Sequence, residues 1–238
     1  MVPVVLTVAI LAGGLATRLR PITETIPKAL VAVAGQPLIL RQLAYLRDQG
    51  VSRVVLCVGY LGNMIEEAVG NGEQFGLSVR YSPDGPTLLG TGGALKKALP
   101  LLGQNFFVLY GDSFLPVNFL QVEQAYIQSG QQALMTVLKN GDRWDKSNVL
   151  FINGQLVEYN KLAPRPEMAY IDYGLGVISA DLLWPYPADK PFDLADVYQE
   201  LSTKGQLSGL EVHERFYEIG SYEGLKEAED YFFIKEKA

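Results

Sequence analysis

The sequence predicts an α/β fold with a mixed, mostly parallel sheet flanked by helices and a smaller antiparallel part. In the first half, short β-branched apolar runs alternate with glycine-containing turns and with stretches of helical periodicity. In the second half, apolar and polar residues alternate more closely, which is typical of antiparallel strands. The chain has 238 residues, of which 48% are hydrophobic and 19% are charged. These values predict a single folded domain over residues 1–238 rather than a disordered chain.

Each expected element of the first half follows from a local pattern. Buried apolar runs predict strands at residues 2–11, 53–58, 77–81 and 106–110. Apolar positions at helical spacing predict helices at residues 37–50, 61–69, 91–99 and 118–129. Proline favours the first turn of a helix and interrupts its interior, so we expect Pro37 to begin one helix and Pro100 to close another. A long loop is expected between the first strand and Gln36.

The elements of the second half complete the predicted sheet. Alternating patterns predict strands at residues 133–138, 149–152, 156–160 and 170–179. Helical spacing predicts helices at residues 192–203 and 222–235. Antiparallel pairing of these strands would extend the parallel sheet of the first half. The expected architecture is a Rossmann-like sheet covered on both faces, with a ligand cleft at the carboxyl ends of the first strands.

Composition excludes several classes of protein. The chain has 20 Lys and Arg against 26 Asp and Glu, a formal net charge of −6, so we expect no sequence-independent binding to nucleic acid or to an anionic membrane surface. Cys57 is the only cysteine, which excludes a disulfide framework and a cysteine zinc site and favours a cytoplasmic location. The apolar N-terminal run has no basic start and is interrupted at Gly13-Gly14, so we expect neither an export signal nor a transmembrane helix.

The most informative stretch is the loop after the first strand. The paired glycines Gly13 and Gly14 let backbone N–H groups approach a ligand that a Cβ would displace. Arg18 supplies a planar guanidinium suited to two phosphate oxygens, and Lys28 supplies a second positive charge placed by the preceding proline. These residues predict a phosphate-binding loop, with an ordinary strand-to-helix loop bearing surface basic residues as the alternative. The loop has neither the Gly-Lys-Ser/Thr of a P-loop nor the GxGxxG of a dinucleotide-binding turn.

Asp112 is the second candidate, because it directly follows the expected strand at residues 106–110. Its carboxylate would lie at the carboxyl edge of the sheet, where ligands of open α/β sheets bind. Carboxylate oxygens are hard ligands that suit Mg²⁺. Asp112 is therefore a candidate Mg²⁺ ligand, and the alternative is an aspartate that caps a turn or a helix.

These motifs together resemble the signature of the sugar-phosphate nucleotidyltransferases, the pyrophosphorylases that make NDP-sugars. That signature reads G-G-x-G-T-R-L-x-P-x-T, followed by P-K-P. The resemblance covers nearly the whole chain and rests on residues 9–14, 17–19, 27–28, 35–38, 90–94 and 110–112. Two residues depart from the signature, because Ala16 stands in place of glycine and Ala29 in place of proline. Both replacements are small, so we expect a slightly stiffer loop that keeps its function.

The resemblance implies a role for each candidate residue. The glycine-rich loop would wrap a triphosphate, Arg18 would contact the departing pyrophosphate, and Lys28 would contact the phosphates at the reacting centre. Asp112 would bind Mg²⁺, and Glu218 stands where many members of the family have a second metal-binding Asp. The expected nucleotide-binding residues are Leu11, Ala12, Gly13, Gly14, Thr17, Asp84, Gly90 and Thr91. The expected sugar-phosphate-binding residues are Lys161, Asp172 and Gly174.

The resemblance also implies how the chain is organised. Residues 1–112 would form the nucleotide-binding half, and residues 113–238 the sugar-phosphate-binding half. Some members of the family carry a C-terminal left-handed β-helix domain, but this sequence has no hexapeptide repeats, so we expect no such domain. The expected small-molecule partners are an NTP and a sugar-1-phosphate, with Mg²⁺ as the cofactor.

The implied reaction transfers NMP from an NTP to a sugar-1-phosphate and releases pyrophosphate. Because a phosphate monoester has a second pKa of roughly 6, it is ionised near neutral pH and needs no general base. This agrees with a chain whose single histidine, His213, is expected at the surface. An alternative of a different class is a catalytically inactive, nucleotide-binding regulatory protein, which the departures at Ala16 and Glu218 suggest.

Residues 83–89 favour GTP as the nucleotide. Residues 89–94 resemble the guanylyl-transferring mannose and heptose branches of the family, which implies a heptose or mannose 1-phosphate as the acceptor. Pyrimidine-using relatives often carry a base-reading glutamine shortly before the glycine that matches Gly90, and residues 83–89 contain neither Gln nor Asn. Asp84 is the polar side chain there that can read a base edge, and its carboxylate can accept both N–H donors of guanine. Residues 81–85 and 97–103 also resemble the N-acetylmuramate-1-phosphate uridylyltransferases. The alternative is therefore UTP with N-acetylmuramate 1-phosphate or another hexose 1-phosphate.

Overall fold

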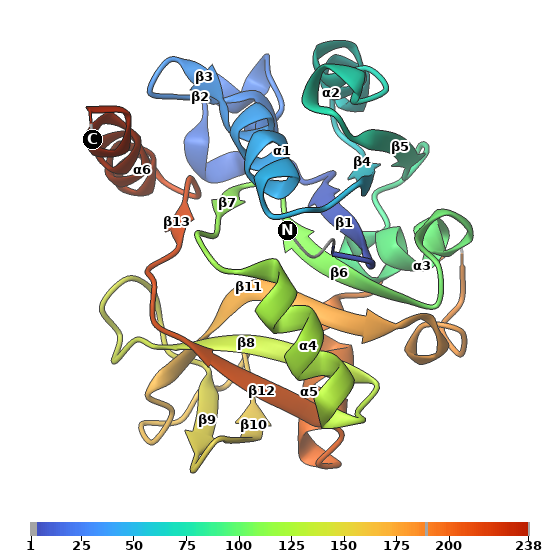
Figure 1. Cartoon of the computed structure of the whole chain (residues 1–238), viewed down its shortest axis with the longest axis vertical. Coiled ribbons are helices and arrows are strands. Elements are labelled where there is room, and N and C mark those ends of the chain that lie inside the picture. The colour runs from blue at the N-terminus through green and yellow to red at the C-terminus, as the bar shows by residue number, and fades with distance from the viewer. Residues whose placement is uncertain (1–3, 189, 238) are drawn as a thin grey trace.

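The computed structural model describes residues 4–188 and 190–237 (Figure 1). These residues form a mixed sheet of nine strands, in which the order is β10-β9-β11-β6-β1-β4-β5 and β8 pairs with both β11 and β12. The nine strands are Thr7–Ala12 (β1), Arg53–Val58 (β4), Ser78–Pro83 (β5), Asn105–Tyr110 (β6), Ala133–Lys139 (β8), Val149–Ile152 (β9), Gln155–Tyr159 (β10), Tyr170–Ser179 (β11) and Leu207–Val212 (β12). Helices cover both faces of this sheet, which confirms the predicted α/β class.

The first half of the chain forms the parallel part of the sheet. Strands β5, β4, β1 and β6 lie in that order and pair in parallel. In β1 the residues from Thr7 to Ile10 are all buried, as expected for a parallel strand between two layers of helices. The carboxyl ends of β1, β4 and β6 therefore meet at one edge of the sheet, and the loops that follow them lie there.

The helices are Leu38–Asp48 (α1), Gly62–Val69 (α2), Gly90–Leu102 (α3), Phe119–Ser129 (α4), Leu194–Thr203 (α5) and Tyr222–Lys237 (α6). Helices α1, α2 and α4 pack on one face of the sheet, and α3 and α5 pack on the other. The prediction that Pro100 closes α3 is wrong, because α3 continues through it to Leu102. Pro100 lies in the last turn, where it removes a single i→i−4 hydrogen bond. Gly103, with a φ of 88°, follows the end of the helix instead.

The second half of the chain forms the antiparallel part of the sheet. Strand β11 is antiparallel to β6, β8 and β9, and β9 is antiparallel to β10. Local patterns do not predict β12, nor the short pairs β2–β3 (Ala32–Val33 with Gln36–Pro37) and β7–β13 (Ser113–Phe114 with Tyr217–Glu218). Two of these elements depend on distant partners, since β12 pairs in parallel with β8 and β13 pairs with β7.

Helix α6 brings the C-terminal segment back to the first half of the chain (Figure 1). Phe232 of α6 packs in a small separate core with Val33, Phe114 and Ile219. Together with the β7–β13 pairing, this core fixes the segment around Glu218 beside the end of β6. The fold therefore places a residue of the second half next to the loops of the first half.

Two further expectations from the sequence hold. Cys57 is buried in β4, and His213 is exposed in the segment after β12. Among the residues that the structure describes, no helix combines the length and the apolar character that crossing a membrane requires.

Candidate active site

The carboxyl ends of β1, β4 and β6 border a cleft of about 240 Å³. Nine of the residues predicted for the site line it, namely Leu11, Ala12, Gly13, Gly14, Lys28, Asp84, Gly90, Thr91 and Asp112. They come from the loop after β1, the 3₁₀ turn at Lys28–Leu30, the loop after β5, the start of α3 and the turn after β6. The fold thus brings five segments from between residues 11 and 112 to one place.

The loop at Gly13-Gly14 lines this cleft with its backbone. A Cβ on Gly13 would lie 3.2 Å from the backbone nitrogen of Gly59, so packing between two loops favours glycine there. A Cβ on Gly14 would meet no heavy atom within 4 Å, so packing gives no reason for glycine at this position. Open space beside a loop backbone is what a ligand held by backbone N–H groups requires.

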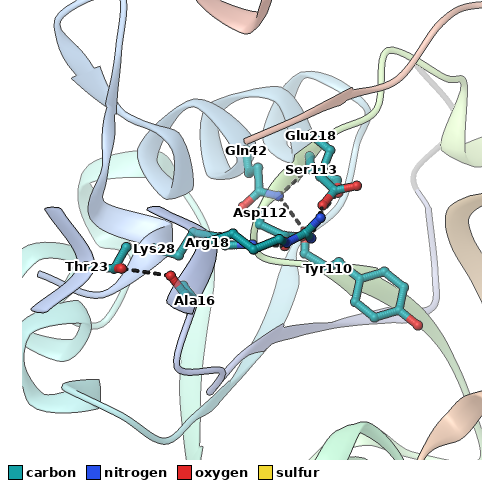
Figure 2. Close-up of polar contacts among 9 residues, drawn as sticks. All are labelled: Ala16, Arg18, Thr23, Lys28, Gln42, Tyr110, Asp112, Ser113 and Glu218. Atoms are coloured by element: carbon teal, nitrogen blue, oxygen red, sulfur yellow. Dashed lines mark hydrogen bonds and ion pairs between the residues drawn. The ribbon is translucent and has the colours of Figure 1, made fainter. Parts of the chain in front are cut away.

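Ala16 adopts a left-handed conformation, with φ 50° and ψ 45°. This conformation costs a residue with a Cβ about 1–2 kcal/mol and costs glycine much less. Its carbonyl oxygen accepts a hydrogen bond from Thr23 Oγ1 at 2.8 Å (Figure 2), and another from the Leu19 backbone at 3.2 Å. The loop is therefore held in place although Ala16 replaces the glycine of the signature.

Lys28 and Asp112 form an ion pair in the cleft, with Nζ 2.7 Å from Oδ2 (Figure 2). The two side chains are only 15% and 26% exposed, so solvent screens this pair less than a surface pair. Ser113 Oγ donates a second hydrogen bond to Asp112, on Oδ1 at 3.2 Å. The carboxylate is thus held on both oxygens, with a positive charge on one of them.

Arg18 and Glu218 meet beside this ion pair, with a guanidinium nitrogen 3.3 Å from Oε1 (Figure 2). Both residues line a second cleft, of about 260 Å³. The side chain of Arg18 is 68% exposed, so this contact contributes little to stability. Burial and then the negative charge of Asp112 raise the pKa of Glu218, while Lys28 and Arg18 lower it. The two carboxylates predicted for the metal site are therefore close enough to repel each other.

The donor set fits Mg²⁺. Within residues 4–188 and 190–237, no group of three or more His, Cys, Asp or Glu side chains converges on one point. Asp112 and Glu218 are the two carboxylates predicted to hold the ion, and Asp145 lines the second cleft together with Glu218. Mg²⁺ is usually bound by one or two carboxylates, with substrate phosphates and waters as its other ligands. A divalent cation would also offset the repulsion that raises the pKa of Glu218.

Asp84 also lines the cleft and is 7% exposed. Its Oδ2 accepts a hydrogen bond from the Leu89 backbone at 3.2 Å, and its carbonyl oxygen accepts one from Lys97 Nζ at 3.0 Å. Burial raises the pKa of Asp84, and the Leu89 N–H and the charge of Lys97 oppose this shift. One carboxylate oxygen is thus fixed by the backbone, which leaves Oδ1 for an incoming group.

The side chain of Thr91 is hydrogen-bonded to residues of the second half of the chain. Its Oγ1 donates to Asp193 Oδ1 at 2.7 Å and accepts from the Leu194 backbone at 2.8 Å. Gly92 donates its backbone N–H to the carbonyl oxygen of Phe192 at 3.0 Å, and a Cβ on Gly92 would lie 2.2 Å from the Phe192 ring. These residues anchor the start of α3, so the Thr91 hydroxyl is not free to reach into the cleft.

Six of the predicted residues do not line the first cleft, namely Thr17, Arg18, Lys161, Asp172, Gly174 and Glu218. Thr17 is exposed at the start of a 3₁₀ turn. Gly174 of β11, with a φ of 95°, lies against Tyr110, the last residue of β6, which lines the cleft. Asp172 Oδ1 accepts a hydrogen bond from the Gly174 backbone at 3.0 Å. Lys161 is exposed, and its charge acts on both Asp172 and Asp193.

Sequence reasoning missed several residues of the cleft, including Cys57, Leu88, Ala94 and Tyr110. Tyr110 had a signal, because it is the last residue of β6 and directly precedes the Gly-Asp turn. Ala94 had one as well, because it ends the 90–94 segment of the resemblance. Cys57 and Leu88 had none, since neither stands in a motif. Cys57 illustrates this, because it is buried in the core and also borders the cleft.

Asp172→Asn is expected to stabilise the protein near pH 7.5. Burial raises the pKa of Asp172 to about 6 from an ordinary 3.8, so the native state binds the proton more tightly than the unfolded state. The stability that this group supplies is present below pH 4 and is lost as the pH rises through 6. The loss amounts to roughly 2–3 kcal/mol, and an Asn side chain avoids it while still accepting the Gly174 N–H.

Urea denaturation of Asp172→Asn and wild type at pH 4.5, 6 and 7.5 measures this effect. The variant's advantage in the free energy of unfolding should grow across the series. An advantage that does not change with pH, or a loss of stability at pH 7.5, would contradict the assignment of Asp172 as a half-buried carboxylate with a raised pKa.

Comparison with known proteins connects this geometry to a family. N-acetylmuramate alpha-1-phosphate uridylyltransferase of Neisseria meningitidis is 43% identical over 111 residues, which are 46% of this chain and 48% of that protein. Mannose-1-phosphate guanylyltransferase catalytic subunit beta of Danio rerio is 29% identical over 218 residues, which are 89% of this chain and 60% of that protein. The matched regions thus cover less than two thirds of these two relatives.

Solved structures and a family model extend the comparison. HddC from Yersinia pseudotuberculosis, solved in complex with GMP-PN, superposes with a TM-score of 0.77 at 26% identity, over 95% of this chain and 99% of that one. A putative glucose-1-phosphate thymidylyltransferase from Bacillus anthracis shares the fold, with a TM-score of 0.84 at 20% identity over 94% of each chain. The family model described as nucleotidyl transferase matches residues 7–147, which include the loop after β1, Lys28, Asp84 and Asp112. The chain belongs to the nucleotidyl transferase family.

Proposed function

We propose that the protein transfers NMP from an NTP to a sugar-1-phosphate, forming an NDP-sugar and releasing pyrophosphate. The observation that carries this proposal is the cleft at the carboxyl edge of the sheet, where the Gly13-Gly14 backbone, Lys28 and Asp112 converge. Backbone donors and a shielded lysine are suited to phosphate groups. The relatives named as uridylyl- and guanylyltransferases of sugar 1-phosphates support the same class of reaction.

The residues of the site would act mainly by positioning and by neutralising charge. The ionised phosphate of the sugar-1-phosphate attacks the α-phosphate of the NTP in line, and pyrophosphate leaves with its electron pair. Lys28 would stabilise the negative charge at the reacting phosphate, and the exposed Arg18 would hold the departing pyrophosphate. Asp112 and Glu218 would hold Mg²⁺, which would supply positive charge against the negative phosphate groups.

The two halves of the chain would bind the two substrates. Residues 1–112 would bind the NTP, with Leu11, Ala12, Gly13, Gly14 and Thr17 around the triphosphate. Residues 113–238 would bind the sugar phosphate through Lys161, Asp172 and Gly174. The contact of Gly174 with Tyr110 supports this division. Tyr110 lines the cleft proposed for the NTP, so Gly174 lies beside that cleft.

The test is a coupled assay of pyrophosphate release over a matrix of NTPs and sugar 1-phosphates in the presence of Mg²⁺. Release should require one NTP and one sugar-1-phosphate together, with mass spectrometry identifying the NDP-sugar. If the protein binds NTPs but releases no pyrophosphate with any acceptor, it is the inactive regulatory protein instead.

For the nucleotide we expect GTP, with a heptose or mannose 1-phosphate as the acceptor. Asp84 is buried in the cleft with Oδ2 bound by the Leu89 N–H, so Oδ1 is the oxygen left to accept a guanine N–H, rather than both oxygens as the sequence suggested. Uracil presents one N–H between two carbonyls, which the carboxylate repels. A single hydrogen bond to a charged group contributes about 1.5–3 kcal/mol. GTP should therefore be preferred over UTP by roughly tenfold.

Competition between GTP and UTP, run on wild type and on Asp84→Asn, checks this expectation. The asparagine keeps the acceptor for the Leu89 N–H and removes the charge, so the preference for GTP should fall severalfold. If UTP outcompetes GTP in wild type, or the variant keeps the same preference, Asp84 does not select guanine. UTP with N-acetylmuramate 1-phosphate would then be favoured, as the 43% identical relative suggests.

A further inference from the structure

A buried amide lies directly behind the turn that carries Asp112 (Figure 2). Gln42 of α1 is 2% exposed, and its Nε2 donates to the carbonyl oxygen of Tyr110 at 2.9 Å and to that of Ser113 at 2.6 Å. Tyr110 ends β6 and Ser113 begins β7, with Gly111 and Asp112 between them. One side chain therefore binds the backbone on both sides of the turn.

The orientation of this amide is determined by its partners. Both N–H bonds of Nε2 point at carbonyl oxygens, and the reversed amide would place Oε1 against the same two oxygens. In the present orientation Oε1 is buried without a hydrogen-bond partner among the described residues. A buried acceptor left without a partner destabilises a folded protein. The chain therefore tolerates an unfavourable buried oxygen in order to hold these two carbonyl groups.

The turn held by Gln42 also sets the position of the second carboxylate. Ser113 is the register partner of Glu218 in the β7–β13 pair. The backbone N–H of Ile219 donates to the carbonyl oxygen of Asp112 at 2.9 Å. A shift of the turn would therefore move Asp112 and Glu218 relative to each other and relative to Lys28.

We infer that Gln42 is a positioning residue for the Asp112–Glu218 pair, acting through the backbone of the β6–β7 turn. Gln42 does not line the cleft, so it touches neither substrate nor metal. This inference rests on the proposed function, because it assigns Gln42 to the carboxylates that would hold the divalent cation. Groups that orient metal ligands from behind typically change metal affinity by about 10–100-fold when they are lost.

The experiment measures Mn²⁺ binding by electron paramagnetic resonance, with Mn²⁺ alone and no nucleotide. Gln42→Met keeps the length of the side chain and removes both donors, and Gln42→Asn keeps the amide but is too short to bridge both carbonyls. Each is expected to weaken Mn²⁺ binding about tenfold or more. Gln49→Met is the matched control, because Gln49 follows α1 and its Oε1 accepts from the Phe119 backbone at 3.3 Å, away from the turn. It should leave Mn²⁺ binding within about twofold.

Urea denaturation of all three variants separates a positioning role from a general loss of stability. The inference holds if the Gln42 variants lose Mn²⁺ affinity while folded and Gln49→Met does not. It is overturned if a folded Gln42 variant binds Mn²⁺ like wild type, or if wild type binds no Mn²⁺ at millimolar concentration. The assay of pyrophosphate release is independent, so a wild type that binds Mn²⁺ without turnover would contradict the proposed function alone.

Discussion

Asp112→Asn is expected to abolish measurable turnover, a loss of roughly 1,000-fold or more, and to leave the fold intact. Loss of one preorganised electrostatic contact typically costs about 100–1,000-fold in rate, and this substitution removes two. The carboxylate no longer offers a negative charge to a divalent cation, and Lys28 loses the partner that lies 2.7 Å from its Nζ. The side-chain volume is unchanged, and Ser113 Oγ can still donate to Oδ1.

Steady-state pyrophosphate release over a range of Mg²⁺ concentrations measures this loss, and thermal unfolding checks the fold. Asp48→Asn is the control, since Asp48 is 61% exposed and pairs with Arg47 on the surface of α1. It should leave both measurements unchanged. Near-normal turnover of Asp112→Asn at low Mg²⁺ would show that the metal binds elsewhere.

The parallel half of the fold could be predicted because its signals are local. Runs such as Arg53–Val58 are short, apolar and bounded by turns, so strand type and position follow from neighbouring residues. The end of α3 could not be placed from the sequence. Pro100 lies in the last turn of the helix, and burial of Leu99 and Leu102 keeps that turn helical. Strand β12 could not be found, since its pairing with β8 joins segments about 75 residues apart and its own pattern is only half buried.

In the candidate site, too, residues with local signals could be predicted, and contacts between distant segments could not. Lys28 and Asp112 could be selected because each stands in a recognisable motif at the end of a strand or turn. Their direct contact spans 84 residues and follows only from the folded chain. The contact of Arg18 with Glu218 spans 200 residues and depends on the β7–β13 pair. Gln42 had no signal, since a glutamine on a predicted helix is usually a surface residue.

The fold changes the role expected for Thr91 in nucleotide binding. Thr91 stands in a segment that resembles a nucleotide-binding motif, yet its hydroxyl is bound to Asp193 and to the Leu194 backbone. Any contribution of Thr91 to nucleotide binding would come from its backbone or from holding the start of α3. The glycines around it serve the close approach of Phe192, which is a packing requirement that a motif alone does not reveal.

Lys28→Ala is expected to lower the catalytic rate by about two orders of magnitude or more. Its side chain is only 15% exposed and lies in the cleft against Asp112, where a charge acts more strongly than in water. Arg18→Ala should act differently, because the Arg18 side chain is 68% exposed where it meets Glu218. Its loss should chiefly weaken the binding of NTP in the forward reaction and of pyrophosphate in the reverse reaction.

Steady-state kinetics in both directions distinguish these two roles. For Lys28→Ala the loss should appear in kcat, and Lys28→Met, which keeps most of the aliphatic side chain, should lose as much, because the charge and not the packing is responsible. For Arg18→Ala the KM values for NTP and pyrophosphate should rise while kcat changes less.

Substitution of Lys28 also leaves Asp112 without its positive partner, so the Mg²⁺ concentration that gives half-maximal rate should fall as the cation takes over that role. If both alanine variants keep all kinetic constants within about twofold of wild type, the phosphate groups bind outside the cleft between the Gly13-Gly14 loop and Asp112.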